Sequence, residues 1–216
     1  MLIDLQGLCE KYDFIPNGII HIGGHTGEES EVYENIGIKN IVWVEAIEAK
    51  YLQIVNKVRN FPMNFVVNKV VSDKDNEMVN FHQTDNFASS SIFPLGTHKH
   101  HHPKVSVVEI TEVKTTSLDT IMDHKLKAAF QIAGRKVEDF DTLNLDIQGA
   151  ELLALKGYSK NLKNIDWIYT EVNEEHLYEG CCLMGELDEY LSEFSRVETQ
   201  MSSHMWGDAL YIRIKN

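Results

Sequence analysis

The sequence has few cysteines and no long apolar run. Its three cysteines, Cys9 and the adjacent pair Cys181-Cys182, are too few and too unevenly spaced for a disulfide framework or a zinc site. Reduced thiols are typical of the cytosol, so we expect a cytoplasmic protein. No apolar stretch approaches the roughly 20 residues that span a bilayer. The N-terminus also lacks a basic region followed by an apolar core and a cleavage site. We therefore expect neither a membrane partner nor export.

Basic side chains are scarce relative to acidic ones. The chain carries 20 Lys and Arg against 33 Asp and Glu, a formal net charge of -13. Nucleic-acid binding depends on clustered Lys and Arg that neutralise phosphates. The charge balance therefore argues against RNA or DNA as a partner. It does not define a small substrate, because steering depends on local rather than net charge.

Internal repeats, low-complexity segments and linkers are also absent. The 216 residues, 43% of them hydrophobic, are enough to bury the core of one α/β domain, and we take residues 1–216 as that domain. Apolar runs typical of strands alternate with helical patterns through most of the chain. This alternation predicts a mostly parallel sheet with helices on both faces.

The pattern also predicts individual elements. Residues 1–17 contain a short packing helix, and the run 65–71 is followed by a segment, 78–82, that returns as a hairpin strand. The last two strands are close enough in sequence to pair as an antiparallel hairpin. Further helices are expected over 27–36, around 51–58, from 116 to 126 and over 186–194, and further strands over 19–22, 41–45, 105–113, 142–146, 165–171, 196–201 and 209–214.

A glycine-rich turn follows the first strand and opens into a helix. Glycines let the backbone approach a ligand closely, and the first amides of a helix point unpaired donors at it. The turn carries Gly23, Gly24 and Gly27 but lacks the G-x-G-x-x-G spacing of dinucleotide sites, which disfavours NAD. The acidic pair Glu28-Glu29 would repel a pyrophosphate but suits a sulfonium cofactor. We therefore predict S-adenosylmethionine, although the glycines alone are equally compatible with ordinary turn chemistry.

Polar residues follow three other expected strands. Glu45 ends the second strand, where nucleotide-binding folds place a carboxylate for the ribose hydroxyls. Ser72 and Asp73 follow the third, either as a plain turn or as partners of the adenine amine. Asp146 and Gln148 come at the end of the strand that begins at 142. In an open parallel sheet, ligands bind at this edge.

Residues 83–104 have no regular pattern, and we predict that they form an active-site loop covering the substrate. The loop contains the histidine-rich run 98–102. Neighbouring histidines in one run rarely converge on a single ion, so we predict no metal site there. One of these side chains, with His98 and His100 as the candidates, could instead serve as a catalytic base.

Several blocks together resemble the FkbM-type family of S-adenosylmethionine-dependent methyltransferases. The most specific is Asp146-Ile147-Gln148-Gly149-Ala150-Glu151, together with the Leu-Asp element before it. The glycine turn alone would fit many methyltransferases. The resembling blocks span nearly the whole chain: 21–29, 44–46, 71–73, 89–91, 116–119, 146–151 and 207–211.

The resemblance implies a class I methyltransferase (Rossmann-like) fold, in which a mostly parallel seven-stranded sheet ends in an antiparallel C-terminal strand. It also implies methyl transfer to a hydroxyl, often on a sugar or a glycosylated small molecule. By position, Gly23, His25 and Gly27 would line the methionine half of the cofactor, and Glu45 would hold the ribose. Ser72 and Asp73 would flank the adenine, and Asp146 would face the methyl-transfer centre. One departure is His21, which stands where many methyltransferases have an acid.

The mechanism leaves alternatives open at this point. Asp146, a histidine of the run 98–102, or His204 could remove the proton from the acceptor hydroxyl. Asp146 could equally hold the cofactor amine, or act in a metal-assisted reaction with Asp208 or His176. Two other functions share the pattern. A binding module without turnover would explain His21, and a nicotinamide-dependent oxidoreductase would also use Glu45.

Overall fold

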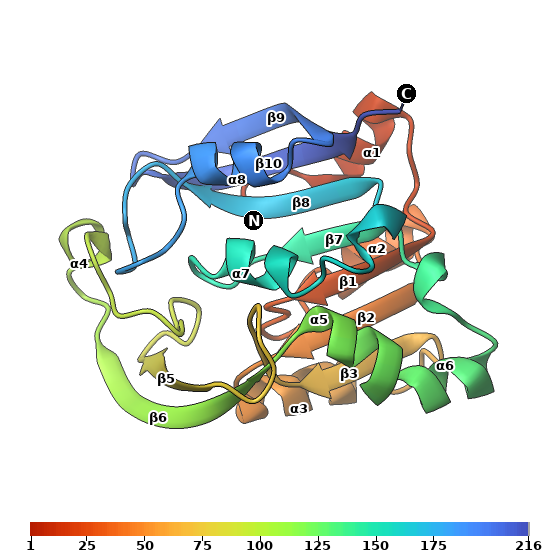
Figure 1. Ribbon diagram of the computed structural model, residues 1–216, viewed down its shortest axis with the longest axis horizontal. Helices are drawn as coiled ribbons and strands as arrows, with labels where there is room; N and C mark the ends of the chain where they lie inside the picture. Colours follow the sequence, from red (N-terminus) through yellow and green to blue (C-terminus); the bar gives the residue numbers. More distant parts are fainter. Residues whose placement is uncertain (216) are drawn as a thin grey trace.

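Seven strands form the central sheet, in the order β3-β2-β1-β7-β8-β10-β9 (Figure 1). The computed structural model describes residues 1–215 of the chain. Strands β3 to β8 in this order pair in parallel, and β10 runs antiparallel to both of its neighbours. The predicted mostly parallel sheet with an antiparallel C-terminal strand is therefore confirmed. The strands are β1 (Gly18–Ile22), β2 (Asn40–Glu45), β3 (Asn64–Asn68), β7 (Thr142–Leu145), β8 (Trp167–Asn173), β9 (Phe194–Met201) and β10 (Trp206–Arg213).

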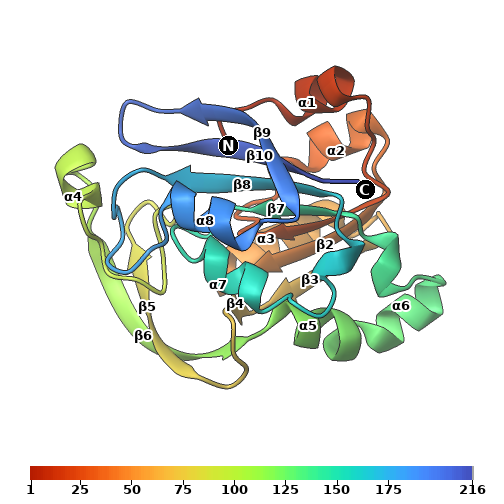
Figure 2. The same cartoon turned by 45° about the horizontal axis from the view of Figure 1, so that its top comes forward.

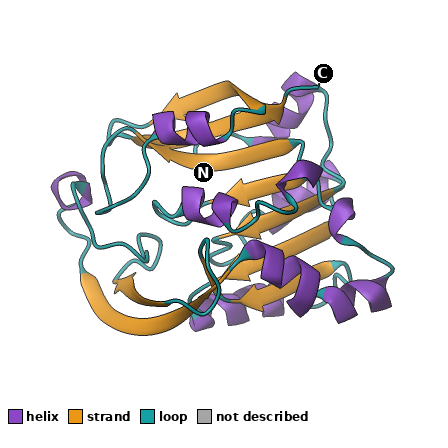
Figure 3. Cartoon of the chain, viewed as in Figure 1, coloured by secondary structure: helices purple, strands orange, loops and turns teal. Residues whose placement is uncertain are grey.

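Helices cover both faces of this sheet (Figure 3). Side chains alternate along a strand, so β1 sends Ile20 and Ile22 into one core and Ile19 into the other. The first core contains the helices α5 (Leu118–Thr120), η1 (Ile121–Lys125), α6 (Lys127–Ala133), α7 (Glu151–Lys156) and α8 (Met184–Tyr190). The second contains α1 (Leu5–Tyr12), α2 (Ser30–Ile36) and α3 (Glu48–Val58). Two short 3-10 turns, η2 (Val137–Asp139) and η3 (Leu162–Asn164), complete the helices of the sheet region.

A separate three-stranded sheet extends from one end of the molecule, as Figure 2 shows below the central sheet. Its order is β4-β6-β5, formed by β4 (Val70–Val71), β5 (Met78–Thr84) and β6 (Val107–Thr116). The predicted return of 78–82 onto the run 65–71 is wrong. Strand β5 pairs antiparallel with β6 instead, and the run 65–71 divides at Lys69 between the two sheets. The segment between β5 and β6 carries the short helix α4 (His98–His101).

One detail of the prediction needs correction. The helix after the glycine turn begins at Ser30 rather than Gly27, so Glu28 and Glu29 precede it and do not form its first turn. The packing helix expected in 1–17 covers Leu5–Tyr12, where Asp4 caps it by accepting the amides of Gln6 and Gly7. Within residues 1–215, no helix is long and apolar enough to cross a membrane.

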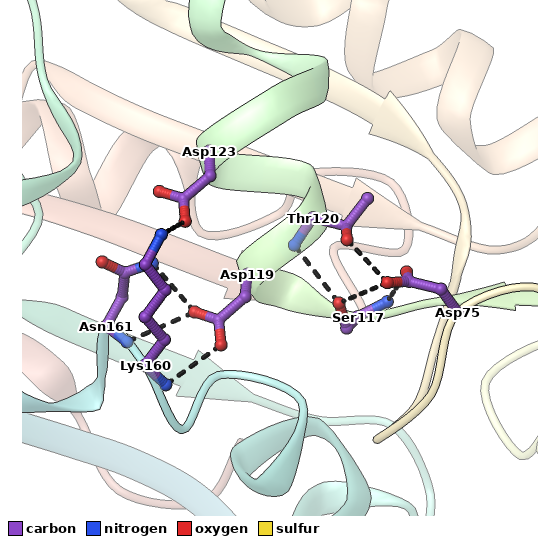
Figure 4. Close-up of polar contacts among 7 residues, drawn as sticks. All are labelled: Asp75, Ser117, Asp119, Thr120, Asp123, Lys160 and Asn161. Atoms are coloured by element: carbon purple, nitrogen blue, oxygen red, sulfur yellow. Dashed lines mark hydrogen bonds and ion pairs between the residues drawn. The ribbon is translucent and has the colours of Figure 1, made fainter.

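The Thr-Ser-Leu-Asp block at 116–119 has a structural role (Figure 4). Asp119 accepts hydrogen bonds from the backbone amides of Lys160 and Asn161 and from the Asn161 side chain, at 2.8–3.2 Å. On the other side, Asp75 accepts from the Ser117 amide at 2.8 Å and from the Thr120 hydroxyl at 2.7 Å. These contacts fasten the start of α5 to two loops that are distant in sequence.

Candidate active site

The glycine turn places backbone, rather than side chains, against the end of β7. Gly23 has φ +86°, and a Cβ added to it would lie 1.8 Å from the carbonyl oxygen of Asp146. Only glycine fits a left-handed position with a neighbour that close. Gly24 is also crowded, since its Cβ would meet Trp43 and Ile54 at 3.0 Å. The turn therefore brings Gly23 and Asp146 together at the carboxyl edge of the sheet.

Glu45 ends β2 beside this turn. One of its carboxylate oxygens accepts the backbone amide of His25 and the other accepts that of Ile47, both at 2.8 Å. Burial raises the pKa of Glu45, and the two amides oppose that rise. A carboxylate oxygen accepts more than one hydrogen bond. Glu45 is therefore held in orientation by the two amides and can still accept hydrogen bonds from the hydroxyl groups of a ligand.

A cavity of about 300 Å³ lies over these residues, which we call the glycine cavity. This volume is at the lower end of the range for small-molecule sites. Polar side chains in its lining include His25, Glu28, Glu29, Glu45, Lys69 and Asp146. Apolar side chains in the lining include Ile47, Val70, Val71, Phe81, Phe87 and Ile92. A lining of both kinds suits a nucleoside with a polar tail.

Ser72 and Asp73, predicted to flank the adenine, do not line this cavity. The Ser72 hydroxyl bonds to the Asp73 carboxylate at 3.1 Å, and Ser72 is buried. Val70 and Val71, two residues earlier, line the cavity instead, because the chain leaves the central sheet at Lys69. Gly27 also lies outside the lining, and its carbonyl accepts a hydrogen bond from Lys57.

Asp146 lies in a hydrogen-bonded group at the ends of β7 and β8. The Gln148 side-chain amide donates to Asp146 at 2.7 Å and to Glu171 at 2.8 Å. Its carbonyl accepts the Tyr178 hydroxyl at 2.5 Å. Gln148 itself has φ +58°, an unfavourable conformation for a residue with a side chain. His25 at φ +44° and Phe87 at φ +59°, which line the glycine cavity, share this left-handed conformation with Gln148.

A second cavity of about 250 Å³, the histidine cavity, adjoins the first. Met1, Ala88, Asp146 and Gln148 line both cavities, so the two meet at Asp146. The wall of the histidine cavity also contains aromatic, imidazole and acidic side chains: Tyr178, Trp206, His98, His102 and Glu171. No Lys or Arg is among the described residues that line it.

The histidine-rich run is spread over both the lining and the surface. His98 is buried and lines the histidine cavity, whereas His100 is exposed and lines neither cavity. Burial first, and then the neighbouring His102 and His101, lower the pKa of His98 to about 4. His204, from the turn between β9 and β10, packs its ring on those of His101 and His102. Among residues 1–215, no three His, Cys, Asp or Glu side chains are arranged to hold a metal ion.

His21 faces away from both cavities. Its ring is buried between Trp43 and Tyr33, and its Nδ1 lies 2.9 Å from the Tyr33 hydroxyl. Burial lowers the pKa of His21, so the imidazole is neutral in the core. The departure from an acidic residue at this position therefore changes the packing of β1 and does not remove a group from the cavity wall.

Comparison with known proteins adds the family. Residues 21–198, most of the chain, match the methyltransferase FkbM domain. The chain belongs to the FkbM methyltransferase family. This family assignment agrees with the resemblance seen in the sequence. A comparison with curated proteins found no match to the chain.

Solved structures agree with the Rossmann-like methyltransferase fold. The methyltransferase FkbM from Methylobacillus flagellatus KT is 12% identical, with a TM-score of 0.56 over 90% of this chain and 43% of that one. The chain thus spans less than half the length of that protein. The B. subtilis M1A22 tRNA methyltransferase TrmK is 10% identical, with a TM-score of 0.50 over 99% and 66% of the two chains. The M. capricolum TrmK in complex with S-adenosyl-homocysteine is 9% identical, with a TM-score of 0.45 over 99% and 69%.

Some residues of the two cavities gave no signal in the sequence. Phe87 and Ile92 lie in the irregular loop, Tyr178 follows β8, and Trp206 begins β10 without a motif. Glu171 was visible only as a polar strand end. Phe87, Ile92 and Tyr178 reach the cavities through loop paths, which residue spacing does not encode.

Proposed function

We propose that this FkbM-family chain binds S-adenosylmethionine in the glycine cavity and methylates a hydroxyl of a small-molecule or carbohydrate acceptor in the histidine cavity. The observation that carries the proposal is the meeting of the two cavities at Asp146. A methyl donor on one side and an acceptor on the other would face each other there. Holding two reactants in line is a large part of what such an enzyme must do.

The residues of the glycine cavity fit the cofactor. Gly23 lets the turn pass directly against the Asp146 carbonyl, which keeps both residues in the cavity lining, and the Glu45 carboxylate is held in place for two ribose hydroxyls. The apolar side chains of Ile47, Val70 and Phe87 suit an adenine ring. The cofactor, when bound, supplies a methyl group activated by a positively charged sulfur.

The acceptor hydroxyl has to lose a proton as its oxygen becomes methylated. His98 is the base we favour, because it lines the histidine cavity and its Nδ1 has no hydrogen-bond partner among the described residues. Its pKa of about 4 leaves the imidazole unprotonated but a weak base, so it takes the proton only as methylation makes the acceptor hydroxyl acidic. Asp146 is the other candidate, and it already accepts a hydrogen bond from Gln148. We assign no role to His100, which is exposed.

The aromatic rings of Tyr178 and Trp206 favour a carbohydrate acceptor. Aromatic faces pack against the apolar faces of sugar rings, while polar neighbours bind the hydroxyls. The same wall carries Asn86, Ser89 and His98 as hydrogen-bonding groups. A hydroxyl on a sugar or a glycosylated small molecule is therefore the acceptor class that we propose.

Calorimetric titration tests the cofactor assignment. We expect S-adenosylmethionine to bind in the micromolar range and Glu45→Gln to weaken it about tenfold, roughly 1.4 kcal/mol. Glu48→Gln, an exposed change on α3, is the matched control and should leave the affinity unchanged. Tighter binding of NAD than of S-adenosylmethionine would favour the nicotinamide alternative. Binding without methylated product over a panel of glycosides would favour a binding module.

A further inference from the structure

The junction of the two cavities holds two carboxyl groups that share one amide. Gln148 donates one N–H to Asp146 and the other to Glu171. The strands that carry them, β7 and β8, are neighbours in the sheet, so both acids reach the same edge. Glu171 is 5% exposed, and Asp208 on β10 lies directly opposite it in the sheet. Asp208 accepts the Tyr169 hydroxyl and the amides of Leu2 and Ile3, so Asp146 and Glu171 form the pair that shares Gln148 where water has little access.

No basic side chain balances this group. Neither Asp146 nor Glu171 forms an ion pair with Lys, Arg or His in the part of the chain that the structure describes. Burial raises the pKa of Asp146, and the Met1 amino group and the Gln148 hydrogen bond oppose that rise. Burial, and then the charges of Asp146, Glu151 and Asp208, raise the pKa of Glu171. The other titratable groups that face them are Glu29 before α2, His21 on β1, Glu151 on α7, Tyr169 and Tyr178, and the Met1 amino group.

Two negative charges sharing one amide without an ion-paired cation are costly in such a site. A single retained proton removes this repulsion, as it does in other carboxylate pairs. The Met1 amino group lies close enough for the neighbouring carboxylates to raise its pKa against the effect of burial. It is not within ion-pair distance of either acid, so the carboxyl pair still gains from holding a proton.

An independent observation indicates a ligand that donates hydrogen bonds. His98 lines the same cavity, is 4% exposed, and its Nδ1 has no hydrogen-bond partner in the described residues. With its pKa lowered to about 4, this imidazole is neutral and has an acceptor nitrogen. The carboxyl pair and the unpartnered imidazole of His98 thus line the same cavity. A ligand group rich in N–H donors would bind the acceptors of this wall.

We propose that Asp146 and Glu171 form a proton-linked ammonium site: the pair holds one proton in the ligand-free protein and releases it when a primary ammonium group binds at the junction. The ammonium replaces the proton as the positive charge between the two acids, and the proton goes to the solvent. Its source is either the amino-acid tail of the cofactor or an amine on the acceptor. The first source rests on the proposed function; the shared proton does not.

Calorimetry in two buffers of different ionisation enthalpy counts the released protons. S-adenosyl-homocysteine, which has the amino-acid tail, is compared with 5′-methylthioadenosine, which lacks it. We expect the first to release up to one proton per site at neutral pH and the second to release none. Glu171→Gln should abolish the proton release and weaken the binding of S-adenosyl-homocysteine about tenfold, without changing the affinity for 5′-methylthioadenosine. Glu174, three residues later, is exposed, so the control variant Glu174→Gln should bind and release protons as the natural chain does.

A further arm distinguishes the ammonium sources. Glucosamine and glucose are titrated into the protein that already holds S-adenosyl-homocysteine. Proton release by glucosamine alone, after none by S-adenosyl-homocysteine, would assign the ammonium to the acceptor. Binding of S-adenosyl-homocysteine with no proton release from any ligand would overturn the proposal. Equal release by the natural chain and Glu171→Gln would overturn it too.

Failure of the cofactor assignment would be recognised separately. If neither nucleoside binds, the proposed function fails. The shared proton can then be tested by titrating the carboxyl groups of the ligand-free protein. Carbon NMR of the side-chain carboxyl groups should then show one group of the pair titrating well above the usual range, and Glu171→Gln should remove that titration. Ordinary titration of both groups near pH 4 would refute the shared proton directly.

Discussion

At the scale of single residues, Gly23 shows how an absent side chain positions the candidate site. The turn after β1 must pass against the carbonyl of Asp146, and the backbone there adopts φ +86°. Both features exclude a side chain, for different reasons. One is local conformation, and the other is a neighbour that belongs to another strand.

Gly23→Ala separates these two reasons when it is compared with Gly37→Ala. Gly37 has a similar φ of +92°, but nothing lies within 4 Å of its added Cβ. The left-handed conformation alone costs about 1–2 kcal/mol. We expect Gly37→Ala to lose that amount, and Gly23→Ala to lose more than about 3 kcal/mol because the clash adds to it. Urea unfolding measures both. Equal losses would mean that the turn relaxes away from Asp146.

The sequence predicted those site residues that lie at strand ends. Gly23, His25, Glu45 and Asp146 line the glycine cavity, because the carboxyl ends of parallel strands share one edge of a sheet. Ser72 and Asp73 follow the same rule but lie outside the lining, since β3 ends early and β4 joins another sheet. The rule depends on where a strand ends, which the pattern locates only to within a few residues.

At the scale of elements, the hydrogen bonds of Asp119 hold the start of α5 to the loop after α7. Asp119→Ala would remove the acceptor of two backbone amides and one side-chain amide. We expect the free energy of unfolding to fall by about 1–3 kcal/mol, because the amides lose their partner. Affinity for the cofactor should not change, since Asp119 lines neither cavity.

Asp123→Ala is the matched control for this change. Asp123 lies one turn later and pairs with the Lys160 side chain; the lysine is 68% exposed and the aspartate 17%. Because the lysine is solvated, we expect this ion pair to contribute about 1 kcal/mol or less. Chemical denaturation should therefore rank Asp119→Ala clearly below Asp123→Ala. A reversed order would assign the stability to the ion pair instead of the amide contacts.

The elements of the central sheet were predictable because each strand and helix carries its own pattern. The pairing of β5 with β6 was not. The two strands are separated by the irregular segment and α4, and a strand pattern does not name its partner. The lining of the two cavities was not predictable for the same reason, because it depends on how the segment between β5 and β6 folds back over the sheet.

At the scale of the whole molecule, an acidic chain buries acids at one edge of its sheet. Glu151 accepts the amides of Ile147 and Gly149 through one oxygen, and its other oxygen has no partner in the described residues. Burial raises the pKa of Glu151 to about 7, and the charge of Asp146 adds to the rise. The folded protein therefore keeps a proton on Glu151 that the unfolded chain releases at lower pH.

The sign of the resulting pH dependence follows from this difference. Glutamate in an unfolded chain titrates at about 4.3. The contribution of Glu151 to stability is thus fully present below about pH 4.3 and is lost as the pH rises through about 7. Its size is on the order of 3 kcal/mol. The molecule should be more stable in mild acid than at pH 8, opposite to a protein held by salt-bridged carboxylates.

Glu151→Gln tests this behaviour because glutamine keeps the accepting oxygen and cannot ionise. We expect the variant to match the natural chain in urea unfolding near pH 5 and to exceed it at pH 8. Glu34→Gln, an exposed change on α2, controls for the altered net charge. Parallel stability curves for the natural chain and Glu151→Gln would show that Glu151 is ionised in the folded state. The buried edge would then hold its negative charge without a proton, and the cation it needs would have to come from a bound ligand.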